Sequence, residues 1–208
     1  MNALILVDIQ NDFLPSGSLA VNDGDHIIAT INRIQMAFDL LVATQDWHPQ
    51  AHKSFASNHA GKKAFEVINL NGMPQVLWPD HCIQGTRGSE FHSGLNMDKV
   101  EAIFRKGMDP KIDSYSGFYD NGYKKSTGLA GYLHERNVDR VFVCGLAGDF
   151  CVAFTAKDSI KEDFETYVIE DVIKSIDEDG YQRIKTQLEK VGVKFINSDQ
   201  IVGVLGGE

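Results

Sequence analysis

Long apolar runs and a surplus of basic residues are both missing from this sequence. The longest apolar stretches have the length of a β-strand, so none of them is long enough to span a bilayer. The first residues, MNALILVDIQ, contain no basic leader and no cleavage site, and we therefore expect no signal peptide. The formal net charge is −9, from 29 acidic and 20 basic residues, which argues against nucleic acid or an anionic membrane as a partner.

Cysteine is scarce as well. The three cysteines, Cys82, Cys144 and Cys151, are an odd number and do not have the spacing of a disulfide framework. Free thiols are typical of a reducing compartment, so we predict a cytoplasmic protein.

Motifs for nucleotide binding are also absent. No G-x-G-x-x-G follows the first apolar run, and no G-x-x-x-x-G-K-[ST] occurs in the chain. The dinucleotide-binding and P-loop interpretations therefore lose support.

Short apolar segments alternate with segments of helical periodicity. The predicted strands are residues 3–9, 40–44, 100–105, 138–144, 166–169 and 193–196. The predicted helices are residues 25–38, 127–136, 151–162 and 180–191, with a short helix near the C-terminus. This alternation predicts a three-layer α/β/α fold, in which helices cover both faces of a mostly parallel sheet.

Residues 47–96 differ in composition from the rest of the chain. They are rich in His, Gly, Pro, Asn and Ser and contain only short apolar pieces. A structureless loop of this length is uncommon unless it is functional. We therefore predict a single domain, residues 1–208, with a site-building insertion at about 47–96 after the second strand. Short helices and a hairpin are expected within it.

Polar side chains that can carry chemistry come at the ends of the predicted strands. They are Asp8, Asp46, Lys106 and Cys151, from four separate parts of the chain. Folds of this class bind ligands at the carboxyl ends of their parallel strands. We therefore expect these side chains to gather at one edge of the sheet.

Cys151 follows a strand and a turn of small residues, in the predicted first turn of a helix. Exposed N–H groups at a helix N-terminus favour a thiolate and can hold a developing oxyanion. In this interpretation Asp8 is a general base for the thiol, and Lys106 stabilises both negative charges. The alternatives are a packed thiol, an aspartate that caps its loop and a solvated lysine.

Asp46 and His48 leave the second strand two residues apart, and His81 follows in the insertion. Mixed carboxylate and imidazole ligands suit Zn, Fe or Mn. His52 and His59 are alternative fourth ligands. Cys82 could also bind a metal, although we favour a packed thiol there, and a core position for Cys144.

Aromatic residues concentrate in the loops that follow the strands. They are Phe13, Trp78, Tyr115, Phe118 and Tyr119. A small flat pocket lined by aromatic faces is the functional interpretation. Packing of the loops against the domain is the alternative.

Together these segments resemble the nicotinamidase/pyrazinamidase family, within the isochorismatase-like cysteine hydrolases. The similar segments occur in the family's order and span most of the chain: VDIQNDF with LPSGSLAV, TQDWHPQAHKSFASNH, LWPDHCIQGTRGSEFH, FRKGMDPKIDSYSGFYDN and VFVCGLAGDFCVAFTAKD. The combination of DWH with WPxHC is the more specific part, because it carries a metal site that many relatives lack.

The resemblance implies a role for each matching position. It implies a catalytic triad of Asp8, Lys106 and Cys151. It implies one divalent metal ion, zinc by preference, on Asp46, His48 and His81. It also implies a cis peptide bond between Leu146 and Ala147, with an oxyanion hole formed by the N–H groups of Ala147 and Cys151. The implied substrate pocket consists of Phe13, Leu19, Trp78 and Tyr115.

The activity that the resemblance implies is metal-dependent hydrolysis of nicotinamide to nicotinate and ammonia in NAD salvage, with pyrazinamide as a further substrate. The substrate is then the main partner, and a homo-oligomer stays open. Gly148 and Phe150 depart from the family's usual Thr and Tyr, which bears on substrate preference. The alternatives are a related cysteine amidase acting on another small amide, and a catalytically silent member that binds a metabolite.

Overall fold

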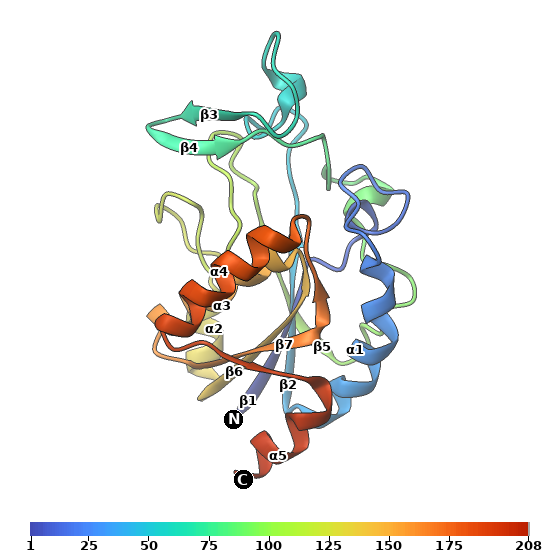
Figure 1. Ribbon diagram of the computed structural model, residues 1–208, viewed down its shortest axis with the longest axis vertical. Coiled ribbons are helices and arrows are strands. Elements are labelled where there is room, and N and C mark those ends of the chain that lie inside the picture. Colours follow the sequence, from blue (N-terminus) through green and yellow to red (C-terminus); the bar gives the residue numbers. More distant parts are fainter. Residues whose placement is uncertain (208) are drawn as a thin grey trace.

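A parallel sheet forms the centre of the molecule. The computed structural model describes residues 1–207. Six strands lie in the order β5-β2-β1-β6-β7-β8, and every pairing between them is parallel (Figure 1). Their bounds are β1 Asn2–Val7, β2 Leu40–Asp46, β5 Val100–Lys106, β6 Arg140–Leu146, β7 Glu165–Lys174 and β8 Lys194–Ile196. The predicted sheet is confirmed.

Helices cover both faces of this sheet (Figure 1). Residues of α1 and α5 share one apolar cluster with the sheet, and residues of α2, α3 and α4 share the other. Alternate residues of β1 divide between the two clusters: Leu4 and Leu6 belong to the first, Ile5 and Val7 to the second. A strand buried on both faces needs apolar residues at every position, which explains the continuous apolar run in the sequence.

The helices are α1 Ile28–Ile34, α2 Leu129–Glu135, α3 Ala153–Lys161, α4 Glu178–Lys190 and α5 Ile201–Gly206. Short 3-10 turns occur at Asn11–Phe13, Gly24–Ile27, Gln35–Ala37, Ala56–Asn58, Arg87–Ser89 and Ser198–Gln200. The helix predicted at 25–38 is therefore α1 with a 3-10 turn at each end. The three-layer α/β/α architecture is confirmed.

Much of the segment 47–96, including its hairpin, lies beyond the carboxyl ends of the strands (Figure 1), and its last residues return along α1, where Asn32 Nδ2 donates to the carbonyl oxygen of Gly94. It contains an antiparallel hairpin outside the main sheet, formed by β3 (Val67–Leu70) and β4 (Met73–Val76). Two of the short 3-10 turns, Ala56–Asn58 and Arg87–Ser89, also fall in this segment. The short helices and the hairpin expected here are present.

Strand β7 is longer than the sequence predicts, since it continues from 165 to 174. Its pairing with β6 shifts register between Val143 and Gly145. The polar pair Glu170 and Asp171 interrupts the apolar run near this shift. A prediction from apolar periodicity therefore ends the strand too early.

The order of the strands decides where a site can form. Strand β1 lies at the centre, with β2 and β5 on one side and β6, β7 and β8 on the other. The chain thus reverses its direction of travel across the sheet between β1 and β6, and ligands bind at such switch points. Within residues 1–207, no helix has both the length and the apolarity that a membrane span requires.

Candidate active site

Four side chains from four neighbouring strand ends meet at the carboxyl edge of the sheet. Asp46 and Lys106 are the last residues of β2 and β5, and Asp8 directly follows β1. Cys151 lies in a π-helical turn, Gly148–Val152, between β6 and α3. All four are buried: their exposed fractions are 0% for Asp8, 3% for Asp46, 2% for Lys106 and 6% for Cys151. The structure therefore brings together the four residues that the strand-end rule singled out.

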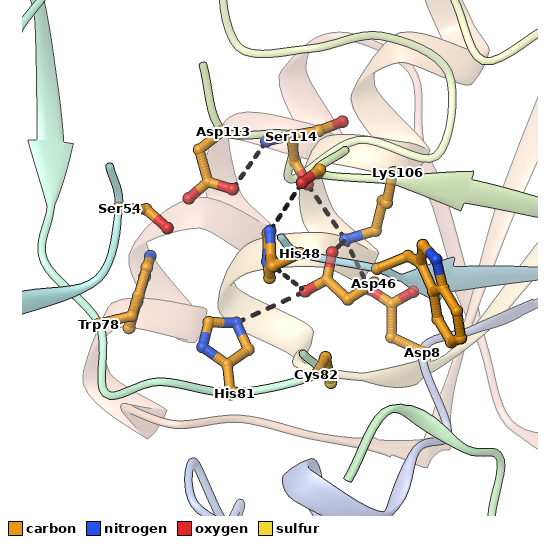
Figure 2. A network of polar contacts seen from close by, with 12 residues as sticks. Asp8, Asp46, His48, Ser54, Trp78, His81, Cys82, Lys106, Asp113 and Ser114 are labelled. Atoms are coloured by element: carbon orange, nitrogen blue, oxygen red, sulfur yellow. Dashed lines mark hydrogen bonds and ion pairs between the residues drawn. The ribbon is translucent and has the colours of Figure 1, made fainter. Parts of the chain in front are cut away.

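Lys106 contacts the other three side chains, and Figure 2 shows it beside Asp8 and Asp46. Its Nζ lies 2.8 Å from Asp8 Oδ2, 2.5 Å from Asp46 Oδ1 and 3.3 Å from Cys151 Sγ. It also donates a hydrogen bond to the carbonyl oxygen of Ser114 at 3.1 Å. Burial alone would lower the pKa of Lys106, but the two carboxylates raise it well above its usual value. The ammonium therefore stays charged in the interior.

Asp8 is held in an unusual conformation beside Cys151. Its φ of 48° lies in the left-handed region, which non-glycine residues adopt uncommonly. Thr44 Oγ1 donates a hydrogen bond to Asp8 Oδ1 at 2.6 Å. Burial raises the pKa of Asp8, although Lys106 opposes the shift. A carboxylate with a raised pKa is a stronger base for a neighbouring thiol.

The thiol of Cys151 is desolvated, and this burial raises its pKa well above the usual value. Lys106 lowers the pKa of Cys151, but the effect is smaller than that of burial. Burial therefore opposes the thiolate that the helix N-terminus was predicted to favour. Ligand atoms of Asp8, Asp46 and Cys151 lie within 4.8 Å of one another, so Asp8 is placed to receive the thiol proton.

The backbone that leads from β6 into the turn of Cys151 passes very close to the end of β1. Gly145 has a φ of 118°, and a Cβ there would lie 2.1 Å from the carbonyl oxygen of Val7, so glycine is required at this close approach. The peptide bond between Leu146 and Ala147 is cis, as the resemblance implies. Ala147 and Cys151 both line a pocket at the end of this turn.

Asp149 ties the same turn to the loop that follows β7. Its two carboxylate oxygens accept hydrogen bonds from the backbone N–H groups of Ile176, at 3.0 Å, and Asp177, at 2.9 Å. Asp149 is 7% exposed, and Ile176 lines the pocket beside Cys151. Asp149 therefore holds one wall of the pocket against the turn of Cys151.

Replacing Asp149 with asparagine is expected to lower the free energy of unfolding by about 1–3 kcal/mol, because one buried backbone N–H then faces an amide N–H instead of an acceptor. Urea denaturation measures the change. Asp177→Asn is the matched control: the Asp177 side chain is 58% exposed and pairs only loosely with Arg183, at 3.3 Å. Equal stability of the two variants would contradict the anchoring role of Asp149.

A carboxylate and two imidazoles converge next to Lys106 (Figure 2). Asp46 Oδ2 lies 3.5 Å from His48 Nε2 and 3.6 Å from His81 Nε2. The Nδ1 atoms of His48 and His81 lie 2.9 Å and 2.8 Å from the carbonyl oxygens of Gly107 and Pro79. Each Nδ1 therefore carries the proton, and each Nε2 offers a lone pair.

This arrangement fits a divalent metal ion. Neighbouring ligand atoms around a tetrahedral zinc ion with bonds of about 2.0–2.1 Å are separated by about 3.3 Å, close to the separations seen here. Mixed oxygen and nitrogen donors with second-shell carbonyls suit Zn, Fe or Mn. Asp46, His48 and His81 thus form one group of residues among residues 1–207 that could hold a metal.

The surroundings of Asp46 keep its carboxylate ionised and fix its position, and both effects favour the binding of a cation. Burial would raise the pKa of Asp46, but Lys106 and His48 hold it well below its usual range. Gln10 fixes the backbone: its side chain donates to the carbonyl oxygen of Asp46 and accepts from the N–H of Asp46, both at 2.8 Å. Sequence analysis missed this role of Gln10, which is fully buried.

Of the two alternative fourth ligands, His52 is near the site and His59 is not. His52 is fully buried, with its ring centroid 4.4 Å from that of His48. Its Nδ1 lies 2.7 Å from Ser54 Oγ, whereas its Nε2 has no hydrogen-bond partner among residues 1–207. Burial lowers the pKa of His52 to about 4, so the imidazole is neutral. His59 instead turns its Nε2 to the carbonyl oxygen of Lys53, at 2.8 Å.

Asp113 is a further acidic residue at the site, and sequence analysis missed it. Its carboxylate is 3% exposed and accepts hydrogen bonds from the Ser114 N–H at 2.8 Å and from Gln75 Nε2 at 3.0 Å. Its ligand atoms lie within 4.8 Å of those of His48 and His52. No metal or catalytic motif in the sequence marks this position.

A small pocket opens beside Cys151 and the candidate metal ligands. The four predicted pocket residues all line it: Phe13, Leu19, Trp78 and Tyr115. Phe150 and Ile176 also line it. The Trp78 and Phe150 rings meet edge to face with centroids 4.8 Å apart, and Trp78 Nε1 donates to Tyr115 Oη at 3.3 Å. These contacts give the pocket a flat aromatic wall.

The aromatic interpretation is wrong for Phe118 and Tyr119. Phe118 is fully buried in the core under α2 and α3, where it contacts Phe164. Tyr119 turns outward and donates a hydrogen bond to Glu162 at 2.7 Å. The loop after β5 therefore sends its aromatic side chains in different directions, which its composition alone does not reveal.

The other two cysteines are packed, as expected. Cys82 and Cys144 are both fully buried in the apolar cluster on the α1 face. Cys82 Sγ lies 3.9 Å from the carbonyl oxygen of Gly88. Within residues 1–207, neither cysteine belongs to a group of residues that could hold a metal ion.

Comparison with known proteins gives consistent matches over most of the chain. The Isochorismatase domain family matches residues 2–200. A nicotinamidase of Acinetobacter baylyi is 50% identical over 201 residues, covering 96% of this chain and 94% of the relative. A solved nicotinamidase/pyrazinamidase of Acinetobacter baumanii is 50% identical, with a TM-score of 0.94 over 96% of this chain and 97% of that one. A pyrazinamidase of Pyrococcus horikoshii, solved in complex with zinc, is 36% identical, with a TM-score of 0.77 over 94% and 98%.

Proposed function

Since this chain belongs to the isochorismatase family, we propose that it is a nicotinamidase, which hydrolyses nicotinamide to nicotinate and ammonia. The observation that carries the proposal is the buried group of Asp8, Lys106 and Cys151, with Lys106 Nζ 2.8 Å from the carboxylate and 3.3 Å from the sulfur. This group opens into an aromatic pocket beside a metal-ligand set. A thiol, a base and a fixed positive charge are the parts that amide cleavage by a cysteine requires.

The first half of the reaction forms a thioester. Asp8 takes the proton of Cys151, and the sulfur attacks the carboxamide carbon. The backbone N–H groups of Ala147 and Cys151 receive the oxyanion, and one such donor contributes about 3–4 kcal/mol of barrier reduction. Asp8 then gives its proton to the nitrogen, the C–N bond breaks and ammonia leaves.

The second half of the reaction reverses the role of the base. Asp8 takes a proton from water, whose oxygen attacks the thioester carbon. The C–S bond breaks, nicotinate is released and the proton returns to Cys151. Lys106 keeps its charge throughout, so that Asp8 and the sulfur are never both unpaired anions.

The pocket suits a flat heteroaromatic ring. We propose that the ring lies among Phe13, Trp78, Tyr115 and Phe150, which line the pocket around Cys151. Asp46, His48 and His81 would hold a divalent ion, which would supply a Lewis acid for the ring nitrogen. Residues 47–96 are then the insertion that builds this site within one domain, because Trp78 and two of the three candidate ligands come from it.

Metal removal tests the proposal directly. The purified protein is expected to release ammonia from nicotinamide. This activity should disappear after chelation and return when zinc is added. His48→Ala is expected to weaken zinc binding by at least about tenfold, measured by metal analysis after dialysis. His59→Ala, in the same insertion but bonded to the Lys53 carbonyl, is the control and should keep the metal. Turnover that survives verified metal loss would contradict the metal half of the proposal.

A related amidase is the second candidate, favoured by two residues at the pocket. Phe150 lines the pocket, and Gly148 precedes it in the turn of Cys151. A Cβ on Gly148 would lie 2.5 Å from Ser175 Oγ, so a larger residue there would displace the loop that holds Ile176. Rates with nicotinamide, pyrazinamide and other small amides decide between the candidates.

A further inference from the structure

Asp113 is a buried carboxylate with no cation beside it. It is 3% exposed, and both hydrogen bonds it accepts come from neutral groups, the Ser114 N–H and Gln75 Nε2. No lysine, arginine or histidine within residues 1–207 forms an ion pair with it, although Lys106 pairs with both Asp8 and Asp46. Burying a charge without a partner costs free energy, and a cation bound near Asp113 would reduce this cost.

Asp113 faces the candidate metal ligands. Its carboxylate, His48 and His52 form one group whose ligand atoms lie within 4.8 Å of one another, and His48 is shared with the group of Asp46 and His81. His52 adds an independent sign that something binds there, because its fully buried Nε2 has no hydrogen-bond partner among the described residues. His48 is therefore common to the two groups.

The charges of the buried cluster lead to the same cation. With Asp8 ionised, as its role as a base requires, the cluster contains the carboxylates of Asp8, Asp46 and Asp113 and a single ammonium, that of Lys106. The cluster thus contains more carboxylates than ammonium groups, and a bound divalent cation would offset this excess.

We propose that Asp113 is the second anionic residue of the metal site, and that it stabilises the ion held by Asp46, His48 and His81 through the ion's coordination shell. His52 lies beside Asp113, with ligand atoms of both within 4.8 Å of each other and of His48. This inference rests on the metal site of the proposed function. In this proposal Asp113 increases the affinity of the site for the metal ion and takes part in no step of the reaction.

The test is zinc affinity in the variant Asp113→Asn. Chelated protein is titrated with zinc in competition with a chromogenic chelator. The dissociation constant is expected to rise by about 10–100-fold, the range for residues that support metal ligands, with the stoichiometry still one ion per chain. The metal-free variant is expected to unfold within a few degrees of metal-free wild type, because the removal of an uncompensated buried charge offsets the hydrogen bond that the asparagine amide cannot accept.

Asp120→Asn is the matched control. Asp120 lies in the same loop, is 8% exposed and accepts hydrogen bonds from the N–H groups of Gly122, Lys124 and Lys125. A purely structural carboxylate of this kind should show the opposite pattern: lower stability without metal and unchanged zinc affinity. Asp113→Ser, which also removes the charge, is the second test variant.

The outcomes separate this inference from the proposed function. If wild type binds zinc and both Asp113 variants bind it equally well, the inference is overturned and the proposed function stands. Failure of both metal-free Asp113 variants to fold also overturns the inference, because it requires their stability to be kept. If wild type binds no divalent ion, the metal site itself fails.

Discussion

Replacing Cys151 with alanine is expected to reduce the release of ammonia from nicotinamide by at least about 10⁴-fold, since the thioester cannot form. The fold should be kept, because the sulfur is lost from a turn that Gly145 and Asp149 hold through contacts of their own. Zinc binding should also be kept, because the candidate ligands lie on β2 and in the segment 47–96. Steady-state kinetics, circular dichroism and metal analysis measure the three properties.

Cys144→Ala is the matched control for this experiment. Cys144 lies seven positions earlier, within β6, and is fully buried in the core. Its replacement removes the same atom and is expected to lower the free energy of unfolding by about 1 kcal/mol while turnover is retained. Substantial turnover in Cys151→Ala, or an equal loss in Cys144→Ala, would contradict the assignment of the nucleophile.

The catalytic cluster was predictable from the sequence because one geometric rule covers all of its parts. The strands are continuous apolar runs, so their ends are visible, and in a parallel sheet neighbouring carboxyl ends lie together. Asp8, Asp46 and Lys106 could be placed in this way without knowing any contact. The pairing of β1 with β2 follows the order of the chain, whereas β6 reaches the other side of β1 by a crossover from β5.

The functional residues that the sequence did not predict owe their roles to contacts between distant parts of the chain. Asp113 meets His48 and His52 only because the loop after β5 folds back over the segment 47–96, and Gln75 reaches it from β4. Loops such as the one with Phe118 follow no periodicity, so the direction of each side chain is decided by tertiary packing. The raised pKa of Cys151 has the same origin, because desolvation depends on everything that covers the sulfur.

The largest effect on stability is expected from Lys106→Met, which removes the ammonium from between Asp8 and Asp46 and leaves two buried carboxylates without their lysine partner. Breaking a buried ion pair from one side typically lowers the free energy of unfolding by about 3–5 kcal/mol. Turnover should be lost in the same variant, because Asp8 then binds its proton more tightly and the developing thiolate has no counter-charge. Urea unfolding of metal-free protein and ammonia release measure the two effects.

The pH dependence of the free energy of unfolding shows whether buried charges cause the destabilisation of Lys106→Met. Lys106 lowers the pKa of both Asp8 and Asp46 in the wild type, so its removal raises both above the unfolded value of about 3.9. A raised folded pKa favours the protonated folded state, so the penalty is present at neutral pH and shrinks as the pH falls through the raised pKa values. The stability deficit of Lys106→Met should therefore be smaller at pH 5 than at pH 7. Asp8→Asn combined with Lys106→Met should recover part of it, since one unpaired charge is removed. A deficit that is independent of pH and undiminished in the double variant would mean that lost packing, and not the buried charges, accounts for the effect.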